Sequence, residues 1–397
     1  MNPLYETMET SVFERMSLAA ARHGAVNLGQ GFPDFGWPEA ILEVAAAALR
    51  EGSNQYAPSR GLPVLREAVA QHYRRHHGLA LGPEEVCVTS GATEALAAAI
   101  LATVEPGNEV IVMTPAYDAY SPLVQRAGGV VREVALAPPG WRIEREAIEA
   151  AVTARTRAII LNNPHNPTGR LFDGDELEAV ARVARDHDLI VISDEVWEHL
   201  LLGPQPIPGT PHSLVPPPFL PFGTLPGMAA RTIKCGSAGK IFSLTGWKVG
   251  WLVAPPEIVT LAARAHQFLT FATAPNLQTA VAHGLSEDGD AWLEPMRAAF
   301  TTARDRMGAG LARAGFTFQP SAATYFLVVD LAASGIAMDD DAFAKLAVEQ
   351  AGVAVVPLSP FAMEAAPRHL VRLCFAKRDE TIDAGVAAMA DARRLAR

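Results

Sequence analysis

Apolar residues recur at spacings of three and four in several long segments, the pattern of helices that bury one face. These segments are residues 38–51, 62–77, 92–104, 174–187, 256–285, 294–314, 340–351 and 379–396. Short runs rich in β-branched residues lie between the earlier segments and predict strands. The runs are "EVCVT" at 85–89, "EVIVM" at 109–113, "VVREVAL" at 130–136, "RAIIL" at 157–161, "LIVIS" at 189–193, "RTIKC" at 231–235 and "GWLVA" at 250–254.

Strands and helices alternate from about residue 85 to residue 290, and several strand runs are apolar throughout. This pattern predicts an α/β fold with a mostly parallel sheet covered by helices on both faces. The later part reads as a long helix, "TYFLVVD", a helix, "VAVVPL", "LVRLCF" and a last helix, which indicates a smaller α+β unit. We therefore predict a large α/β domain over 38–293 and a small domain formed by 1–37 and 294–397.

The segment at 203–228 is rich in proline, which excludes helix and central strand. It predicts an ordered surface loop, with a flexible linker as the alternative.

Composition narrows the class of protein. The chain has 397 residues and a formal net charge of -10, which disfavours nucleic acid and anionic membranes as partners. Cys87, Cys235 and Cys374 lie far apart in apolar runs and are expected to be reduced packing residues. The N-terminus lacks the apolar core of a signal peptide, and the longest apolar stretches are too short to span a bilayer. We therefore expect a cytoplasmic protein.

Polar or small residues follow four of the predicted strands, where an open parallel sheet binds its ligands. They are Gly91 and Ala92 at the start of a helix, the amide-rich loop "NNPHNPTG" at 162–169, Asp194, and Ser237 with Lys240 in "GSAGK". Each feature alone has a structural explanation, such as a tight turn, a cap or an exposed lysine. Together they provide a phosphate cradle, an amide donor, a carboxylate and a lysine, which an aromatic aldehyde phosphate needs for a Schiff base.

The chemistry accounts for these residue types. A lysine amine has an ordinary pKa of ~10.4, and an apolar setting lowers it so that the amine can bond to an aldehyde. A carboxylate such as Asp194 would keep a pyridine nitrogen protonated, so that the ring accepts electrons from the substrate Cα. Lys248 would stay charged and, with Ser237, face a phosphate.

Seven motifs in sequence resemble the class I, fold type I pyridoxal phosphate aminotransferases, and among these the kynurenine, glutamine and methionine aminotransferases. They are "NLGQGFPDF" (27–35), "NQYAPSRGLPVLREA" (54–68), "SGATEAL" (90–96), "NNPHNPTG" (162–169), "SDEVWEH" (193–199), "SAGKIFSLTGWKVGW" (237–251) and "HLVRLCFAK" (369–377). The resemblance runs over nearly the whole chain from Asn27 onward. It implies pyridoxal 5'-phosphate as cofactor and a homodimer with shared active sites.

The resemblance also implies a role for each matching residue in binding the cofactor. Lys240 is expected to form the Schiff base, Asp194 to face the pyridinium, Asn166 to bond the 3-hydroxyl oxygen, and Tyr117 to stack on the ring, where an ordinary buried tyrosine is the alternative. The phosphate is expected to be held by Gly91, Ala92, Thr93, Ser237 and Lys248, with Tyr56 reaching over from the other subunit. Trp197 stands where the family usually has a tyrosine whose hydroxyl donates to the 3-oxygen.

The substrate is expected to lie beside the cofactor. Arg372, within an apolar strand, is either a structural ion pair or a clamp on the substrate α-carboxylate, and the motif favours the clamp, with Asn166 and Gly31 beside it. Tyr325 and Phe271 are candidates for the side-chain pocket, and core packing explains both equally well.

We therefore predict an aminotransferase that moves the amino group of a neutral L-amino acid (methionine, glutamine or aromatic) to a 2-oxo acid. Lys240 would act as covalent anchor and general acid/base. One alternative is β-elimination from cysteine conjugates by the same cofactor. Another is acyl transfer, because Ser237 and Lys240 match Ser-x-x-Lys, although the Lys-Thr-Gly element is missing.

Two histidines in "HYRRHH", His72 and His76, have a helical spacing that could bind metal. The chain has no HExxH motif, so we expect a solvated helix face and no metal there.

Overall fold

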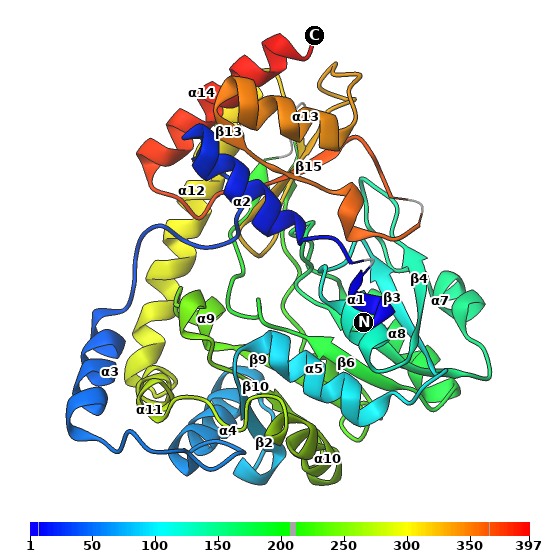
Figure 1. The fold of residues 1–397 in the computed structure, drawn as a ribbon, viewed down its shortest axis with the longest axis vertical. Helices are drawn as coiled ribbons and strands as arrows, with labels where there is room; N and C mark the ends of the chain where they lie inside the picture. The colour runs from blue at the N-terminus through cyan, green and yellow to red at the C-terminus, as the bar shows by residue number, and fades with distance from the viewer. Residues whose placement is uncertain (7, 207–211, 365) are drawn as a thin grey trace.

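The fold is described from a computed structural model that covers residues 1–6, 8–206, 212–364 and 366–397. The described residues form a seven-stranded sheet and a four-stranded sheet, both flanked by helices (Figure 1), and two two-stranded sheets. In the covered residues no helix combines the length and the apolar character that a membrane crossing requires.

The large sheet has seven strands and is mostly parallel, as predicted. In spatial order they are β2 (Val86–Thr89), β10 (Gly250–Val253), β9 (Thr232–Ser237), β6 (Ile190–Asp194), β5 (Thr156–Asn162), β3 (Glu109–Thr114) and β4 (Val130–Ala135). Only β10 runs antiparallel to its neighbours, β2 and β9. Because the other pairs are parallel, their carboxyl ends meet at one edge, where a site can form.

Helices cover both faces of this sheet because successive strand residues point to opposite sides. Val110 and Ile160 pack with α5 (Ala92–Thr103), α6 (Tyr120–Arg126) and α10 (Pro256–Gln267). Their neighbours Ile111 and Ile159 pack with α7 (Arg145–Ala151) and α8 (Gly174–Asp186). The strand runs are therefore apolar throughout, as the sequence indicated.

The smaller sheet is antiparallel and lies in the C-terminal part of the chain. Its order is β11 (Thr317–Gln319), β12 (Phe326–Asp330), β15 (Leu370–Cys374) and β14 (Val356–Pro357). β1 (Val26–Asn27) pairs in parallel with β13 (Val353–Ala354), so the N-terminal segment packs with this part, as expected. Figure 1 shows α2 (Val12–His23) beside α13 (Asp340–Leu346) and α14 (Asp379–Leu395), while α12 (Leu293–Arg313) runs along the side of the molecule.

Two predicted elements differ from the structure. The single helix expected at 256–285 is two helices, α10 and α11 (Pro275–Gly284), because Pro275 starts a new helix and cannot continue the previous one. The run "VAVVPL" is divided at Val355 into β13 and β14, which pair with different partners. The pattern of apolar residues cannot show which neighbour a buried strand chooses.

Several further elements complete the fold. The helices are α1 (Pro3–Glu6), α3 (Glu39–Glu51), α4 (Pro63–His77) and α9 (Ala238–Ile241), with short turns η1 (Pro83–Glu85), η3 (Thr245–Trp247), η4 (Asp288–Trp292), η5 (Ala347–Ala351) and η6 (Ser359–Phe361). In the proline-rich segment, β7 (Gln205–Pro206) pairs with β8 (Ser213–Leu214), followed by η2 (Phe222–Thr224). Phe222 is buried and fixes this loop to the body, whereas residues 207–211 lie outside the described residues.

Candidate active site

A cavity lies where β2, β5, β6 and β9 end, at the edge predicted from the sequence. It is lined by Gly91, Ala92, Thr93, Leu96, Tyr117, Asn162, Asn166, Asp194, Val196, Trp197, Ser237, Gly239, Lys240, Thr245, Lys248 and Val249. Ten of these residues were candidates from the sequence. The structure therefore brings the strand-end features into one place.

One end of the cavity suits an anion. Gly91 has φ +77°, which favours glycine, and it caps the twelve-residue helix α5, whose first residues, Ala92 and Thr93, line the cavity. A Cβ atom added to Gly91 would lie 3.1 Å from Nζ of Lys248. The Lys248 ammonium therefore covers the helix start and adds a full positive charge to the partial charge of the helix. Ser237, at the end of β9, lines the same cavity.

Lys240 lies on α9, directly after β9. Burial lowers the pKa of its amine to about 8. Nζ donates a hydrogen bond of 2.9 Å to the hydroxyl of Tyr325 and lies 4.5 Å from the centre of the Trp197 ring. No carboxylate forms an ion pair with Lys240 in the part of the chain that is described, so a larger fraction of this amine is unprotonated near neutral pH than in an exposed lysine.

Asp194 ends β6 and is buried. Its Oδ2 accepts a 2.6 Å hydrogen bond from the hydroxyl of Tyr120, and its Oδ1 accepts a 3.3 Å bond from the backbone N–H of Val196. Burial raises the pKa of the carboxyl to about 6, although these two hydrogen bonds favour the charged form. A cationic group placed against Asp194 would lower the pKa of this carboxyl. The charged carboxylate would then bind the cation.

The amide loop after β5 is fixed by its own side chains. Asn162 accepts from the backbone N–H of Asn166 at 2.7 Å and donates to the carbonyl of Asp194 at 2.9 Å. Asn162 therefore ties the loop to the end of the next strand. Asn162 and Tyr120 were not candidates from the sequence. The paired register of β5 and β6 places Asn162 beside Asp194, and the packing of α6 brings Tyr120 to the same carboxylate.

Arg372 is buried at the centre of β15. Its Nη1 donates to Oδ1 of Asn166 at 2.8 Å, and its Nη2 donates to the carbonyl of Gly29 at 3.1 Å. Its Nε has no hydrogen-bond partner among the described residues, and burial lowers the pKa of the guanidinium to about 10. The structural ion pair considered from the sequence is absent from the described residues, since no carboxylate there pairs with this charge. A buried cation in this state favours an incoming anion.

Gly31 and Tyr325 lie beside Lys240 rather than in the cavity lining. The Tyr325 hydroxyl accepts from Lys240 and donates to the carbonyl of Gly31. A Cβ at Gly31 would lie 2.7 Å from the Phe326 ring, so the close approach requires glycine. Trp197 packs edge-on against Tyr325 with 4.6 Å between ring centres. These aromatic rings form the apolar wall around the lysine.

Two sequence candidates lie outside the cavity of their own chain. Tyr56 is 88% exposed and Phe271 is 42% exposed, with 5.5 Å between the ring centres. Phe271 was expected to line the side-chain pocket. The structure places it instead in the turn between α10 and α11, where φ is +70°.

Comparisons with known proteins agree with this geometry. The family model for aminotransferase class I and II matches residues 24–389. A probable N-succinyldiaminopimelate aminotransferase of Mycobacterium tuberculosis is 43% identical over 95% of this chain and 94% of its own length. A methionine aminotransferase of Escherichia coli is 38% identical, covering 94% and 93%. Rattus norvegicus kynurenine–oxoglutarate transaminase 3 is 33% identical, covering 96% and 87%.

A solved structure resembles this chain over nearly its full length. The structure of N-succinyldiaminopimelate aminotransferase from Mycobacterium tuberculosis has a TM-score of 0.91 at 43% identity, covering 98% of this chain and 99% of the other. The fold and the sequence thus agree in pointing to one family.

Proposed function

Because this chain belongs to the class I and II aminotransferase family, and is therefore a pyridoxal phosphate-dependent aminotransferase, we propose that it uses neutral L-amino acids as donors in the cavity around Lys240. The main support for placing the reaction in this cavity is that Lys240 and Asp194 both line it. A 2-oxo acid would be the acceptor. The residue roles below are part of this proposal.

The lining residues fit the cofactor. The start of α5 with Lys248 and Ser237 would hold its phosphate, and Asp194, braced by Tyr120, would hold a protonated ring nitrogen. Tyr117 and Asn166 line the same space and would contact the ring and its 3-oxygen. Bound pyridoxal phosphate supplies an aldehyde that condenses with amines and a ring that accepts electrons from the substrate Cα.

Lys240 would then act twice, as the amine that holds the cofactor and as the base that takes the proton from the substrate Cα. A base works best when its pKa is near the working pH, and burial brings the pKa of Lys240 to about 8. The Tyr325 hydroxyl, 2.9 Å away, orients Nζ. Trp197 and Tyr325 form an apolar wall beside the amine that reduces its contact with water.

Arg372 would bind the α-carboxylate of the substrate, because it is a buried cation with an unpartnered Nε and no paired carboxylate in the described part of the chain. Replacing it in Arg372→Lys should lower kcat/KM for amino donors by roughly 100-fold, since the planar fork is lost. The exposed Arg22→Lys is the matched control. Equal kcat/KM in Arg372→Lys and the wild type would contradict the clamp.

A neutral donor is supported by the charges of the cavity. Its cationic lining residues, Lys240 and Lys248, are assigned to the cofactor, and Arg372 to the α-carboxylate, so within this chain a second substrate carboxylate finds no further lining cation. The similarity to the E. coli methionine aminotransferase supports the same class. N-succinyldiaminopimelate is the second candidate donor, supported by 43% identity to the M. tuberculosis protein.

A donor screen decides between these classes. The holoenzyme is incubated with a 2-oxo acid and with methionine, glutamine, phenylalanine, kynurenine, aspartate, glutamate or N-succinyl-LL-diaminopimelate, and amino acid product is measured. We expect methionine, glutamine or the aromatic donors to give the highest kcat/KM. A clear preference for aspartate and glutamate would contradict the neutral class, and a preference for N-succinyldiaminopimelate would establish the second candidate. Pyruvate and ammonia released from a cysteine conjugate without 2-oxo acid would reveal β-elimination.

We also propose a homodimer in which Tyr56 completes the site of the partner subunit. The exposed pair of Tyr56 and Phe271 places two aromatic rings on the surface of a single chain, and a second copy would bury them. Light scattering coupled to size exclusion should give the mass of two chains. A monomer that retains full activity would contradict this arrangement.

A further inference from the structure

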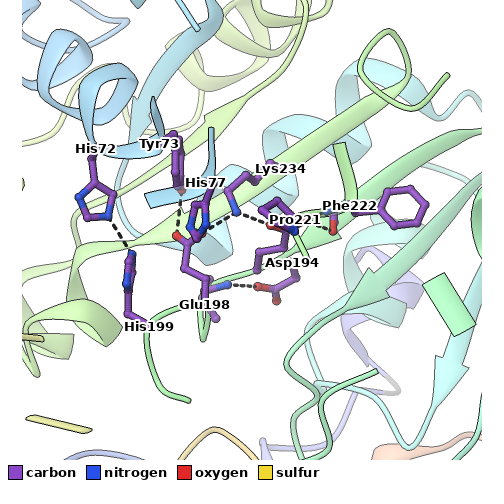
Figure 2. A network of polar contacts seen from close by, with 12 residues as sticks. His72, Tyr73, His77, Asp194, Glu198, His199, Pro221, Phe222 and Lys234 are labelled. Atoms are coloured by element: carbon purple, nitrogen blue, oxygen red, sulfur yellow. Dashed lines mark hydrogen bonds and ion pairs between the residues drawn. The ribbon is translucent and has the colours of Figure 1, made fainter. Parts of the chain in front are cut away.

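A cluster of histidines lies on α4, next to His199 and Asp290. His72 is 1% exposed, which corrects the expectation of a solvated helix face. His76, one turn later, and Asp290, in η4, lie beside it, with side chains about one quarter exposed. Figure 2 shows His72 pointing to His199, while Tyr73, His77 and Lys234 converge on Glu198. The aminotransferase function uses none of the three residues His72, His76 and Asp290.

The three side chains converge on one point. Oδ1 of Asp290 lies 2.8 Å from Nε2 of His76 and 4.0 Å from Nδ1 of His72. The three residues can each offer one ligand atom so that these atoms lie within 4.8 Å of one another. Tetrahedral ligands bonded at ~2.1 Å are separated by roughly 3.4 Å, which falls between the two observed distances. Small side-chain rotations would therefore suffice to hold one ion.

His72 carries a buried nitrogen that the protein leaves unsatisfied. Its Nε2 makes a 2.8 Å hydrogen bond with Nε2 of His199, but its Nδ1 has no hydrogen-bond partner in the described residues. Burial lowers the pKa of His72 to about 3, so the ring is neutral at neutral pH. When His72 donates from Nε2 to His199, the lone pair of Nδ1 points toward Asp290. Histidines that bind metals commonly donate their other N–H in this way.

We propose that His72 Nδ1, His76 Nε2 and Asp290 Oδ1 form a binding site for a divalent transition metal ion, with zinc as the best match. Zn²⁺ accepts imidazole nitrogen and carboxylate oxygen, whereas Mg²⁺ and Ca²⁺ prefer oxygen. The partial exposure of His76 and Asp290 gives the ion a path from solvent and leaves a fourth position for water. The proposal is independent of the donor class above.

The charges around Asp290 are compatible with this site. Although burial opposes it, hydrogen bonds from His76 and Arg75 lower the pKa of the Asp290 carboxyl, so it is ionised at neutral pH. Arg75 donates to Oδ2 of Asp290 at 3.2 Å. Oδ1 contacts Nε2 of His76 at 2.8 Å, so an ion bound to both atoms would displace the proton between them, and His76 would keep a proton on Nδ1. If His72 donates from Nε2 to Nε2 of His199, the His199 ring must carry its own proton on Nδ1. This Nδ1 lies 3.4 Å from Nη2 of Arg297. Arg297 keeps its 3.0 Å bond to the His199 carbonyl in either case.

A neighbouring group, His77 with Glu198 and His199, is a poorer site. Lys234 donates to Glu198 at 2.6 Å, and Tyr73 donates to the other carboxylate oxygen at 3.0 Å. A metal ion there would meet a lysine ammonium and a carboxylate that is already neutralised.

An ion at His72, His76 and Asp290 would join two distant segments. Asp290 is 214 residues from His76 in sequence and directly precedes α12. A ligand that binds the folded state alone stabilises it by mass action. Zinc should therefore raise the unfolding midpoint of the protein.

The test is a titration of chelator-treated holoenzyme with Zn²⁺ in competition with a chromophoric chelator. We expect one ion per chain in the wild type, and an affinity lower by at least about tenfold in His76→Gln and in Asp290→Asn. His23→Gln, at an exposed histidine of α2, is the matched control and should bind as the wild type does. Circular dichroism verifies that each variant is folded.

Two further measurements sharpen the result. X-ray absorption at the zinc edge should show two imidazole ligands and oxygen, and zinc should raise the unfolding midpoint of the wild type more than that of His76→Gln. Equal zinc affinity in wild type, His76→Gln and Asp290→Asn would overturn the proposal, since the ion would then bind elsewhere, for example at the cofactor phosphate. A sulfur ligand at the zinc edge would overturn it as well.

Discussion

Two lysines six positions apart, the buried Lys234 and the partly buried Lys240, have opposite chemistry. Lys234 lies within β9 and donates to Glu195 and, at 2.6 Å, to Glu198 (Figure 2). Lys240 lies just beyond the end of the same strand, and its hydrogen-bond partner is the neutral hydroxyl of Tyr325. The protein therefore buries one ammonium within an ion network and one amine among aromatic rings.

The pKa values follow from this difference. Burial by itself lowers the pKa of both lysines, but the two glutamates more than reverse it at Lys234, where the pKa is raised. At Lys240 burial dominates and the pKa falls to about 8. The carboxylates show the same contrast: Lys234 and His77 hold the pKa of Glu198 well below its ordinary value against the opposing effect of burial, whereas burial raises the pKa of Asp194 to about 6. The groups that have an oppositely charged partner form the ion network, whereas Lys240 and Asp194, which have only neutral hydrogen-bond partners, line the cavity.

The largest expected effect is the loss of activity in Lys240→Ala. Transamination should fall by at least about 1,000-fold, because the residue is proposed to hold the cofactor and to move the Cα proton. Borohydride should fix the cofactor to a peptide containing Lys240 in the wild type and not in the variant. Lys345→Ala, at an exposed position on α13, is the control. Normal turnover in Lys240→Ala would contradict the proposed role of Lys240.

Lys234→Met should instead damage stability. It leaves the carboxylates of Glu195 and Glu198 buried without their cation, which costs about 3–5 kcal/mol of the free energy of unfolding. Urea unfolding at neutral pH measures the loss. The double variant Lys234→Met with Glu198→Gln should recover part of it, because one of the two unpaired charges is removed. An unchanged free energy of unfolding in Lys234→Met would show that the network is not structural.

Replacing Lys240 with methionine should change the free energy of unfolding in the opposite direction from Lys234→Met. In the cofactor-free protein, Lys240→Met should raise the free energy of unfolding at pH 7 by roughly 3 kcal/mol, since a pKa shift of one unit corresponds to ~1.36 kcal/mol. The unfolded wild type binds more protons than the folded form between about pH 8 and the ordinary lysine pKa of 10.5. Wild-type stability should therefore rise with pH through that window, and the advantage of Lys240→Met should shrink there. Urea unfolding at several pH values tests the slope, and a pH-independent advantage would exclude this cause.

The smallest expected effect concerns the surface rather than the buried groups. If Tyr56 donates to the cofactor phosphate of the partner subunit, Tyr56→Phe should weaken cofactor binding by about tenfold, or ~1.4 kcal/mol, and leave the dimer intact. Equilibrium dialysis of the cofactor measures this change. Tyr5→Phe, at another exposed tyrosine, serves as control. Identical cofactor affinity in Tyr56→Phe and wild type would place the residue outside the site.

The apolar pattern predicted the large sheet well. All seven strand runs and most helices occur where they were expected, because burial on both faces leaves a signal in each segment alone. The predicted elements were wrong where one local apolar pattern is compatible with two different structures. The run 256–285 is apolar at helical spacing throughout, yet Pro275 begins a second helix. The division of the chain into domains at residues 38 and 293 stays a prediction.

At the site, the motifs in the sequence identified ten residues that the structure places around one cavity. Asn162 and Tyr120 were missed, because their contacts with Asp194 depend on strand register and on helix packing. The role of Phe271 in the side-chain pocket stays a prediction, since its ring lies outside the cavity lining of its own chain and beside Tyr56.

The sequence by itself determined the fold class and the order of the elements, and it led to Lys240 as the proposed reactive lysine, because each leaves a pattern within a short segment. Only the tertiary structure decided which buried charges are paired. Lys234 and Lys240 share apolar neighbours in sequence, and their partners come from the loop after β6 and from the segment preceding β12. His72 and Asp290 are likewise adjacent only in the folded chain. A pKa depends on charges and solvent within a few ångströms, and this distance is set by packing rather than by position along the chain.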